Sequence, residues 1–568
     1  MSMPKTIVDA LYDDTGDTGP ALTFLSDGTP AGATNWSRSE LLDQVERYAT
    51  AFLERNVGRG DRIVLAVGPG LDFVAALYGI LSIGAAAVPA FPPLRGKDAD
   101  RFAAIVRDCD PALVVLDELL LPRTAALQDA DHRFATLCPA DVARLGTVSG
   151  VRVAAPAAET TALIQYTSGS TGQPKGVLIT HENLVSNCLS IQRNVGTASG
   201  PGFSWLPPYH DMGLIGALIY PLYHGYPIVT MSPLHFVQAP LRWLAGMSHY
   251  RSVMTAAPNF ALDLCVRAVA AEPVADLDLS ALQSLCCGSE PVLEPVVRRF
   301  VDTFADYGLA PTAVLPCYGM AETTLFVAGK PAGTRYRVMP APVGNGEASG
   351  PATTLAVSSG RVDPAHTVVV VDPASRRPVA DGAAGEIWVS GPNVAAGYFG
   401  RPELSAEKFG ATMDSEDDTG YLRTGDLGYL DGGELFVLGR IDDRIVICGR
   451  NIYPHDVEAA LAAAHSWIAK VAVVGVPVDG EQRLGVLIEV RSEAAEPDLP
   501  VRAESLVRET VIRRVGINPH IIRIGGRRTV PTTTSGKLRR AEVRALLAAG
   551  RSPHESESSR GRQDVPVR

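Results

Sequence analysis

The stretch YTSGSTGQPKG, residues 166–176, concentrates groups that can hold phosphate. Its three glycines let backbone N–H groups approach an oxyanion closely, because no side chain intervenes. Four Ser or Thr hydroxyls add donors, and Lys175 adds a positive charge. The Walker pattern is absent, since Lys175 is followed by glycine instead of Ser or Thr. A flexible Ser/Gly surface loop is the alternative, but the apolar strand TALIQY leading into the stretch favours a phosphate-binding loop.

The elements around this loop must position it. Residues 37–56 carry apolar side chains at helical spacing, and DRIVLAVG at 61–68 is a short apolar run typical of a buried strand. The order of helix and then strand is repeated over 71–91 and 100–117. Such alternation predicts an α/β fold with largely parallel sheets that helices cover on both faces.

The pattern changes in the last third of the chain. After about Asp372, short strands with Gly-rich turns follow one another, at 385–391 and 433–439 among others. Beyond Arg440, alternating helical and strand patterns predict a compact α+β unit. Residues 551–568 are polar without an apolar face, so we expect them to be disordered. The sequence thus predicts an N-terminal domain over 1–440, a C-terminal domain over 441–550 and a tail.

Length and composition limit the function classes. A chain of 568 residues is too long for one compact core, so at least two domains are expected. The formal net charge of -11 argues against a nucleic-acid surface. The eight cysteines form no CxxC pair and no metal-type spacing, which favours reduced thiols in a cytoplasmic protein.

Two stretches without charge, Phe73–Leu94 and Met212–Leu234, approach the length of a membrane span. Both are interrupted by Gly and Pro, so we predict core elements of a soluble fold with no integral membrane segment. The N-terminus carries no basic-then-apolar signal pattern, so we do not expect the protein to be secreted.

Six motifs, in this order, resemble those of the adenylate-forming superfamily, which includes acyl-CoA synthetases, luciferases and peptide-synthetase adenylation domains. They are the loop at 166–176, GSEP at 288–291, CYGMAETT at 317–324, YLRTGD at 421–426, GRIDDR at 439–444 and PTTTSGKLRR at 531–540. The resemblance implies a large N-terminal domain of layered α/β subdomains plus a small β-barrel. It also implies a small, mobile α+β C-terminal domain, with ATP and Mg²⁺ as cofactors.

The resemblance also assigns roles to residues. Lys537, Glu322 and His210 are the implied catalytic residues, and Glu322 with Thr167 is the implied magnesium site. Residues implied to bind ATP or AMP are Thr167, Ser168, Gly169, Ser170, Thr171, Gly172, Lys175, Gly288, Ser289, Glu290, Pro291, Cys317, Tyr318, Gly319, Met320, Ala321, Asp426 and Arg440.

These roles fit the chemistry of joining a carboxylate to the α-phosphorus of ATP. Two anions must approach each other, so the site has to supply positive charge and fixed donors. A hard cation such as Mg²⁺ takes a carboxylate ligand like Glu322. Taken alone, Glu322 or Asp426 would be a solvated or capping acid, and Lys537 one basic residue in a basic stretch. Lys537 lies far from the loop in sequence, so only a mobile C-terminal domain would bring it in.

Between the motifs, SWLPPYHDMGLIGALIYPLYHGYPIV, APNFALDLC and RNIYPHDVE closely resemble the fatty-acyl-AMP ligases. These enzymes pass the activated acid to an acyl carrier protein instead of coenzyme A. The implied acyl-binding residues are His210, Asp211, Met212, Gly213, Ile215 and Phe260. Apolar residues at these spacings are also common in a plain core, and Asp211 could instead pair with the amino group of an amino-acid substrate. Since the fatty-acyl-AMP ligase pattern itself contains HD, we expect Asp211 to be structural.

Two features bear on domain motion. About residues 330–367 resemble the insertion of fatty-acyl-AMP ligases, which is thought to restrain the rotation that CoA thioesterification needs; an ordinary surface loop is the alternative. GRIDDR contains two aspartates, Asp442 and Asp443, where the family pattern has one, and we assign the hinge to Asp442.

The sequence therefore predicts a cytoplasmic, ATP- and Mg²⁺-dependent ligase. It converts a fatty acid to an acyl-adenylate with release of pyrophosphate, and then transfers the acyl group to the phosphopantetheine arm of an acyl carrier protein or polyketide synthase carrier domain. A fatty-acyl-CoA synthetase is the alternative. A catalytically silent scaffold is disfavoured, since such a protein should have lost the charged site residues.

Overall fold

The computed structural model describes most of the chain. The described residues are 5–13, 19–94, 96–125, 127–128, 133–145, 156–167, 174–196, 200–342, 355–414, 419–447, 450–478, 481–491, 499–533 and 537–549.

The N-terminal part contains a six-stranded sheet, ordered β6-β5-β3-β4-β7-β8. All neighbours are parallel except β7 and β8, which form an antiparallel pair. Its strands are β3 (Arg62–Ala66), β4 (Ala86–Pro89), β5 (Leu113–Leu116), β6 (Ala135–Leu137), β7 (Thr161–Thr167) and β8 (Lys175–Thr180). The helices of this part are α1 (Ile7–Tyr12), α2 (Arg38–Leu53), α3 (Leu71–Ser82), α4 (Lys97–Cys109), α5 (Leu121–Ala125) and α6 (Pro139–Ala143). The predicted alternation of helices and strands is confirmed.

Local sequence explains where these elements begin. Helix α2 starts with a capping box, in which Ser37 Oγ accepts from the Glu40 amide while Glu40 accepts from the Ser37 amide. Its apolar positions pack on α3, which is buried over nearly its whole length. This burial explains why the charge-free stretch at Phe73–Leu94 forms a core helix and strand.

A second, fourteen-stranded sheet has a parallel half and an antiparallel half that share β13. The parallel half is ordered β13-β12-β11-β9-β10-β1, and β2 pairs antiparallel at its edge. The strands of this half are β1 (Pro20–Leu25), β2 (Ala33–Ser37), β9 (Gly202–Ser204), β10 (Ile228–Met231), β11 (Met254–Ala257), β12 (Ser284–Cys287) and β13 (Val314–Gly319). Its helices are α7 (His181–Val195), α8 (Tyr220–Tyr223), α9 (Pro233–Gln238), α10 (Leu241–Tyr250), α11 (Asn259–Ala271) and α12 (Glu294–Phe304), with a π-helix over Met212–Ile219.

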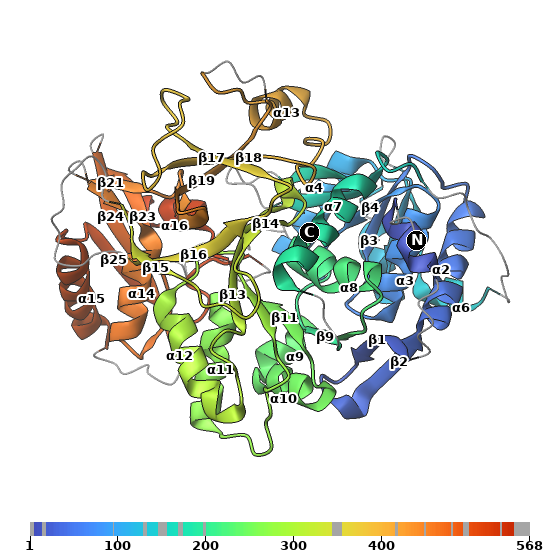
Figure 1. Ribbon diagram of the computed structural model, residues 1–568, viewed down its shortest axis with the longest axis horizontal. Coiled ribbons are helices and arrows are strands. Elements are labelled where there is room, and N and C mark those ends of the chain that lie inside the picture. The colour runs from blue at the N-terminus through green and yellow to red at the C-terminus, as the bar shows by residue number, and fades with distance from the viewer. Residues whose placement is uncertain are drawn as a thin grey trace, which may run out of the picture.

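The antiparallel half occupies the place where the sequence predicted Gly-rich turns and a small barrel. Its strands are β14 (Phe326–Gly329), β15 (Val338–Pro340), β16 (Leu355–Val362), β17 (Thr367–Val371), β18 (Gly385–Ser390), β19 (Leu422–Asp431) and β20 (Glu434–Arg440), with helix α13 (Pro402–Phe409). Among the described strands, β17 stands at the edge and pairs along its length with β18 only. In Figure 1 these yellow strands lie between the green N-terminal elements and the orange C-terminal ones.

The C-terminal unit has its own sheets and its own cores. A three-stranded sheet, β23-β24-β25, packs against α14, α15 and α16, and a small hairpin, β21-β22, precedes it. The bounds are β21 (Ile445–Ile447), β22 (Arg450–Ile452), β23 (Ile468–Val478), β24 (Glu481–Val490), β25 (Ile521–Gly525), α14 (Pro454–Ala464), α15 (Leu499–Val515) and α16 (Arg540–Ala548). The unit stands to one side of the rest of the molecule (Figure 1). The last strand of the large sheet ends at Arg440, where the sequence placed the domain boundary.

The predicted insertion at about 330–367 contributes strands to the fold. β15 pairs with β16, and β16 pairs with β14 and β20 inside the large sheet. Residues 343–354 of the insertion lie outside the described residues. Ala341 and Ala356 belong to a buried apolar cluster, and both Met339 and Tyr453, the latter from the C-terminal unit, pack against that cluster. The described part of the predicted insertion and the C-terminal unit therefore share one apolar cluster.

Neither charge-free stretch makes a membrane span. In the part of the chain that the structure describes, no helix is both long and apolar enough to cross a bilayer. Residues Met212–Leu234 are divided among the π-helix, α8, β10 and the start of α9.

Candidate active site

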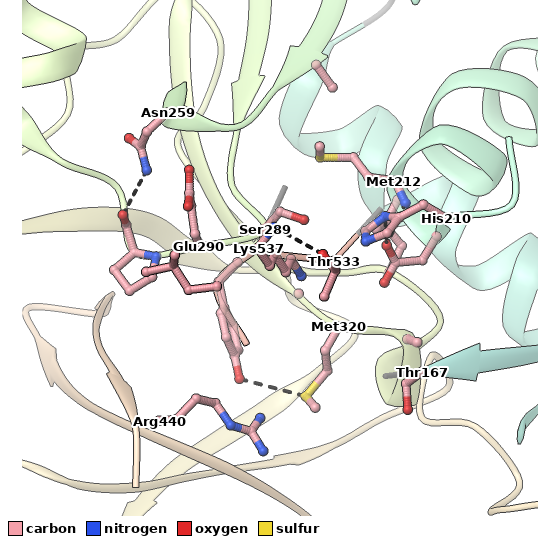
Figure 2. A pocket seen from close by; sticks show the side chains of 18 of the residues that line it. Thr167, His210, Met212, Asn259, Ser289, Glu290, Met320, Arg440, Thr533 and Lys537 are labelled. Carbon is pink, nitrogen blue, oxygen red and sulfur yellow. Dashed lines mark hydrogen bonds and ion pairs between the residues drawn. The ribbon is translucent and has the colours of Figure 1, made fainter. Parts of the chain in front are cut away.

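One large cavity, of about 1140 Å³, lies where the two sheets meet the C-terminal unit. It is lined by residues from segments that are far apart in the sequence, among them His210, Glu322, Asp426, Arg440 and Lys537. Figure 2 shows Lys537 extending into the same space as His210, Ser289 and Glu290. The structure thus brings the predicted catalytic residues and part of the predicted nucleotide residues to a single cavity.

The phosphate loop connects β7 to β8. The antiparallel register pairs Thr167 with Lys175, so both ends of the loop are held side by side, and Thr167 lines the cavity. The predicted phosphate-binding residues between them, Ser168, Gly169, Ser170, Thr171 and Gly172, lie outside the described residues. Lys175 places its Nζ 5.6 Å from the centroid of the Tyr398 ring, a cation–π geometry.

Glu322 lies on a short turn after β13 and faces the cavity. Its Oε1 accepts a hydrogen bond from the Tyr398 hydroxyl at 2.9 Å. Burial raises the pKa of Glu322, while the Tyr398 hydrogen bond opposes that shift. A Cβ at Gly319, before this turn, would lie 1.5 Å from the Leu325 carbonyl oxygen, so only glycine fits there.

Asp426 and Arg440 face each other across neighbouring strands. The antiparallel register pairs them directly, and Arg440 Nη1 lies 3.1 Å from Asp426 Oδ1. The Tyr318 hydroxyl donates to Asp426 Oδ2 at 2.7 Å. The Asp426 carboxylate raises the pKa of the Arg440 guanidinium above its usual range. This fixed pair on the cavity wall can bind a diol, as the predicted ribose contact requires.

The turn predicted to contact adenine follows β12. Ser289, Glu290 and Pro291 line the cavity, and Ser289 has a φ of 73°. A Cβ at Gly288 would lie 2.9 Å from the Cys317 carbonyl oxygen, so this turn packs directly on β13. Of the remaining predicted nucleotide residues, Cys317, Tyr318, Gly319, Met320 and Ala321 all line the cavity, whereas Gly288 and Lys175 are not among its lining residues.

Two hydrogen bonds with Thr533 hold the backbone of Lys537. The Thr533 amide donates to the Lys537 carbonyl oxygen at 2.7 Å, and the Lys537 amide donates to Thr533 Oγ1 at 3.0 Å. Burial raises the pKa of Glu290, and the nearby Lys537 ammonium opposes that shift; the same ammonium adds to the effect of His210 in lowering the pKa of Asp211. Its charge therefore lies between the predicted acyl side and the predicted nucleotide side of the cavity.

His210 and Asp211 form a close pair. His210 Nδ1 lies 2.6 Å from Asp211 Oδ1, and the Met212 amide donates to the same oxygen at 2.7 Å. Burial opposes ionisation of Asp211, but His210, Lys537 and the Met212 N–H together hold its pKa well below the usual range. The Asp211 carboxylate thus finds its partners within the protein, as expected for a structural role.

The π-helix decides which residues face the acyl part of the cavity. Met212, Gly216 and Ala217 line it, a spacing of four and five residues that fits the wider π turn. Gly213 packs on the Pro207 backbone, since a Cβ there would lie 2.2 Å from the Pro207 carbonyl oxygen. Ile215 is fully buried in the core, and Phe260 packs edge-to-face on Trp205 with ring centroids 6.1 Å apart. Of the six predicted acyl-binding residues, the structure places His210, Asp211 and Met212 on the cavity, but not Gly213, Ile215 and Phe260.

Several residues that shape the site were missed from the sequence. Tyr398 does not line the cavity itself but is the hydrogen-bond partner of Glu322, and it stands in GYFG with no motif of its own. The apolar wall is formed by residues that no sequence motif marked, namely Ile191, Val195, Phe203, Ile228 and Met254. Their helical and strand periodicity predicts burial and carries no signal for a cavity.

The predicted hinge lies at the cavity edge. Asp442 lines the cavity just after β20. Its neighbour Asp443 places Oδ2 3.5 Å from Arg540 Nε, and Arg540 also donates to Glu458 Oε2 at 2.9 Å and to the Val473 carbonyl at 3.0 Å. Asp443 is therefore tied to the C-terminal unit, and Asp442 remains the predicted hinge.

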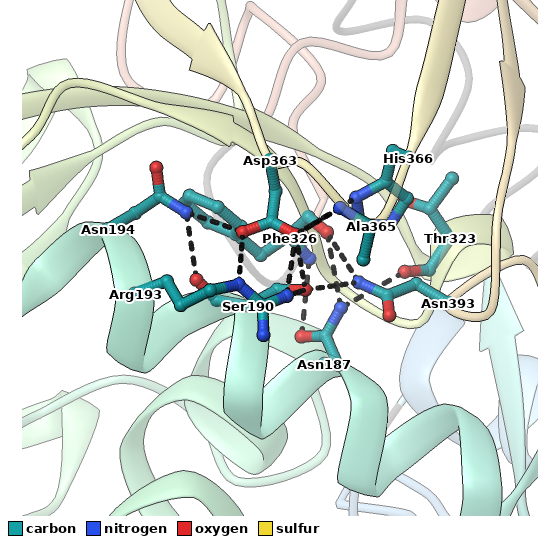
Figure 3. A network of polar contacts seen from close by, with 10 residues as sticks. All are labelled: Asn187, Ser190, Arg193, Asn194, Thr323, Phe326, Asp363, Ala365, His366 and Asn393. Atoms are coloured by element: carbon teal, nitrogen blue, oxygen red, sulfur yellow. Dashed lines mark hydrogen bonds and ion pairs between the residues drawn. The ribbon is translucent and has the colours of Figure 1, made fainter.

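A buried polar network ties helix α7 to the turn that carries Glu322 (Figure 3). At its centre, the fully buried Asp363 carboxylate accepts from Arg193 Nε at 3.0 Å, Asn194 Nδ2 at 2.9 Å and Ser190 Oγ at 3.1 Å. Asn187, one turn earlier on α7, donates to the carbonyl oxygens of Thr323 and Phe326 at 3.3 and 3.2 Å. The network therefore fixes the chain directly after Glu322.

Comparison with known proteins identifies relatives over nearly the whole chain. Residues 14–399 match the family model described as AMP-binding enzyme. The chain is 34% identical over 553 residues to a medium-chain-fatty-acid–[acyl-carrier-protein] ligase of Moorena producens, covering 93% of this chain and 92% of the relative. It is also 34% identical over 511 residues to a long-chain-fatty-acid–AMP ligase of Mycobacterium marinum, covering 85% and 86%.

A solved structure gives the same picture. The fatty acyl-adenylate ligase from L. pneumophila, in complex with acyl adenylate and pyrophosphate, is similar with a TM-score of 0.74 and 31% identity. The similarity covers 96% of both chains.

Proposed function

The chain belongs to the AMP-binding enzymes, among the fatty-acid–AMP ligases, and we propose that it joins a fatty acid to the AMP moiety of ATP. The observation that carries the proposal is the position of Lys537. Its ammonium, from the C-terminal unit, lies in one cavity with Glu322, the Asp426–Arg440 pair and an apolar wall. That arrangement suits an acid with an alkyl chain on one side of the lysine and a nucleotide on the other.

In the proposed reaction the carboxylate of the acid attacks the α-phosphorus, and pyrophosphate leaves. Lys537 reduces the repulsion between the attacking carboxylate and the phosphate, because its charge lies between the two parts of the cavity. Asp426, fixed by Arg440 and Tyr318, binds the ribose hydroxyls. The apolar wall binds the chain of the acid and excludes water from it.

The residues present fit a magnesium ion. In the described parts of the chain no three His, Cys, Asp or Glu side chains gather as metal ligands. Mg²⁺ is commonly bound by only one or two carboxylates together with substrate phosphates, so Glu322 and the phosphates of ATP would be sufficient ligands from protein and substrate. When bound, the ion would neutralise phosphate charge; Tyr398 holds the Glu322 carboxylate in place by its hydrogen bond.

The acceptor of the acyl group is proposed to be the phosphopantetheine thiol of an acyl carrier protein, free or within a polyketide synthase. Two observations support this choice over CoA. A close relative is named as an acyl-carrier-protein ligase. The predicted insertion supplies Ala341 and Ala356 to the apolar cluster against which Tyr453 of the C-terminal unit packs, and this shared packing would oppose rotation of that unit.

The test is a product assay with the full-length protein. A fatty-acid panel, ATP and Mg²⁺ are supplied with either CoA or a holo acyl carrier protein, and the products are identified by mass. We expect the acyl-adenylate to form when no acceptor is present, and the acylated carrier protein to form when the holo carrier is supplied. Efficient acyl-CoA formation would contradict the proposed acceptor, and the absence of any acyl-adenylate would contradict the proposed reaction.

A further inference from the structure

The apolar end of the cavity is bounded by the first residues of three neighbouring parallel strands. Gly202 begins β9, Ile228 begins β10 and Met254 begins β11. The register pairs Gly202 with both Ile228 and Met254, and all three residues line the cavity. We call these three residues the terminal rung.

The terminal rung lies at the opposite edge of the sheet from the reacting groups. His210 and Asn259 follow the carboxyl ends of β9 and β11, as sites on parallel sheets do. β11 has four residues, so at about 3.3 Å per residue its ends lie roughly 10 Å apart. The cavity therefore extends along the sheet from the carboxyl edge to the amino edge.

The wall facing the sheet is formed by α7 and the π-helix. Ile191 and Val195, four residues apart on α7, line the cavity together with Ala217. Gly216 lets the π-helix pack closely on Leu325, because a Cβ there would lie only 3.2 Å from Leu325 Cδ2. The passage between wall and sheet is apolar on both sides, which suits an alkyl chain.

Because Gly202 has no side chain, the side chains of its two strand neighbours can approach each other at the end of this passage. A Cβ at Gly202 would lie 3.0 Å from Ile228 Cδ1 and 3.4 Å from Met254 Cε, the tips of both neighbouring side chains. Ile228 is 2% exposed and Met254 7%, so the passage ends against buried side chains. Any side chain at position 202 would occupy the space between these tips, whereas the flexible Met254 thioether can adapt to what fills it.

We infer that the terminal rung is the end wall for the acyl chain, and that Gly202 and Met254 set the longest unbranched fatty acid that the enzyme activates. This inference rests on the proposed function and extends it from a fatty acid in general to a length limit at named residues. The methyl end of the chain would contact Met254, and the carboxylate would lie at His210 and Lys537.

The test compares Gly202→Val and Met254→Ala with the wild type on a series of saturated straight-chain acids, by following acyl-adenylate formation. Gly202→Val should lower kcat/KM about tenfold or more for the longest acids that the wild type uses. It should leave the shortest acids unchanged, because they do not reach the rung. Met254→Ala should extend the range to longer acids, since it enlarges the end of the passage.

Met247→Ala is the matched control. Met247 is also buried, at 2% exposure, but it lies on α10 and is not among the lining residues. Both variants remove the same atoms, so any general loss of packing would appear in both. Only Met254→Ala should change the range of chain lengths that the enzyme accepts. Gly202→Ala, with its smaller side chain, is a milder second variant if Gly202→Val is poorly folded.

A Gly202→Val enzyme that folds and keeps the wild-type length profile, or loses activity equally on all acids, would overturn the inference. A Met254→Ala profile identical to that of Met247→Ala would do the same. If the wild type forms no acyl-adenylate from any fatty acid, the proposed function itself fails, which is a different result from an unchanged profile in the variants.

Discussion

At the scale of single residues, the site depends on polar side chains that are each held by a neighbour. Asp426 pairs with Arg440, Asp211 pairs with His210, and Glu322 accepts a hydrogen bond from Tyr398. The sequence motifs predicted Glu322, Asp426 and Arg440, because each stands in a recognisable context. Tyr398 was not predicted, since it reaches Glu322 from 76 positions away in the chain and only the fold shows the contact.

Tyr398→Phe gives a test of this local electrostatics by pH. Burial raises the pKa of Glu322, and the Tyr398 hydrogen bond lowers it, so removing the hydroxyl should raise the pKa further. In the proposed function Glu322 holds magnesium only when it is ionised, so activity should be lost as the pH falls through its pKa. The acidic limb of the kcat/KM profile for adenylate formation should move to higher pH in Tyr398→Phe.

Tyr223→Phe is the control for this prediction. The Tyr223 hydroxyl is buried and has no hydrogen-bond partner in the described structure, so its removal should leave the profile unchanged. An acidic limb at the same pH in Tyr398→Phe and wild type would show that Tyr398 does not tune Glu322.

At the scale of elements, the order of helices and strands in the N-terminal half could be predicted well, but one helix type could not. Apolar runs and their spacing identify α2, α3, β3 and β4 because burial imposes a period on the sequence. MGLIGALI at 212–219 is apolar at almost every position, so no period marks one face. Its π-helical winding turns Gly216 and Ala217 toward the cavity and Ile215 into the core, which explains the difference from the predicted acyl-binding set.

The network around Asp363 gives a stability prediction for these elements. Asp363→Asn should lower the thermal unfolding midpoint clearly, because it removes the charge of a fully buried carboxylate that Arg193 and its neighbours bind. Since Arg193 is 44% exposed, the loss should be smaller than the about 3–5 kcal/mol that breaking a fully buried pair costs. The pKa of Asp363 is lowered in the folded state: burial opposes this, but Arg193 and the Ala365 amide outweigh it. Its contribution is thus present above the ordinary carboxyl pKa and is lost as the pH falls through the folded pKa. The difference between wild type and Asp363→Asn should shrink in acid.

The exposed Arg377–Asp414 pair provides the matched comparison. Its side chains are 70% and 62% exposed, and its Nη2–Oδ2 distance is 2.9 Å. Asp414→Asn should change the midpoint little, since exposed pairs contribute about 0–1 kcal/mol. Equal midpoints for the two variants would mean that the Asp363 network does not stabilise the fold.

At the scale of the whole molecule, the site exists only because the C-terminal unit places Lys537 in the cavity of the large domain. Local patterns in the sequence could not predict this contact, because nothing near Lys537 specifies its distance to Glu322 or His210. The resemblance of six ordered motifs predicted it, and the structure brings these residues to one cavity. The Arg540 contacts with Asp443 and Glu458 connect the Lys537 loop to the segment just after β20.

The most direct test of the account is fatty-acid-dependent ATP–pyrophosphate exchange in Lys537→Ala. Lys470→Ala, at an exposed position in β23 of the same unit, is the control. We predict that Lys537→Ala loses exchange by several orders of magnitude while Lys470→Ala keeps the wild-type rate. Near-normal exchange in a folded Lys537→Ala enzyme would contradict the central role of this lysine in forming the acyl-adenylate.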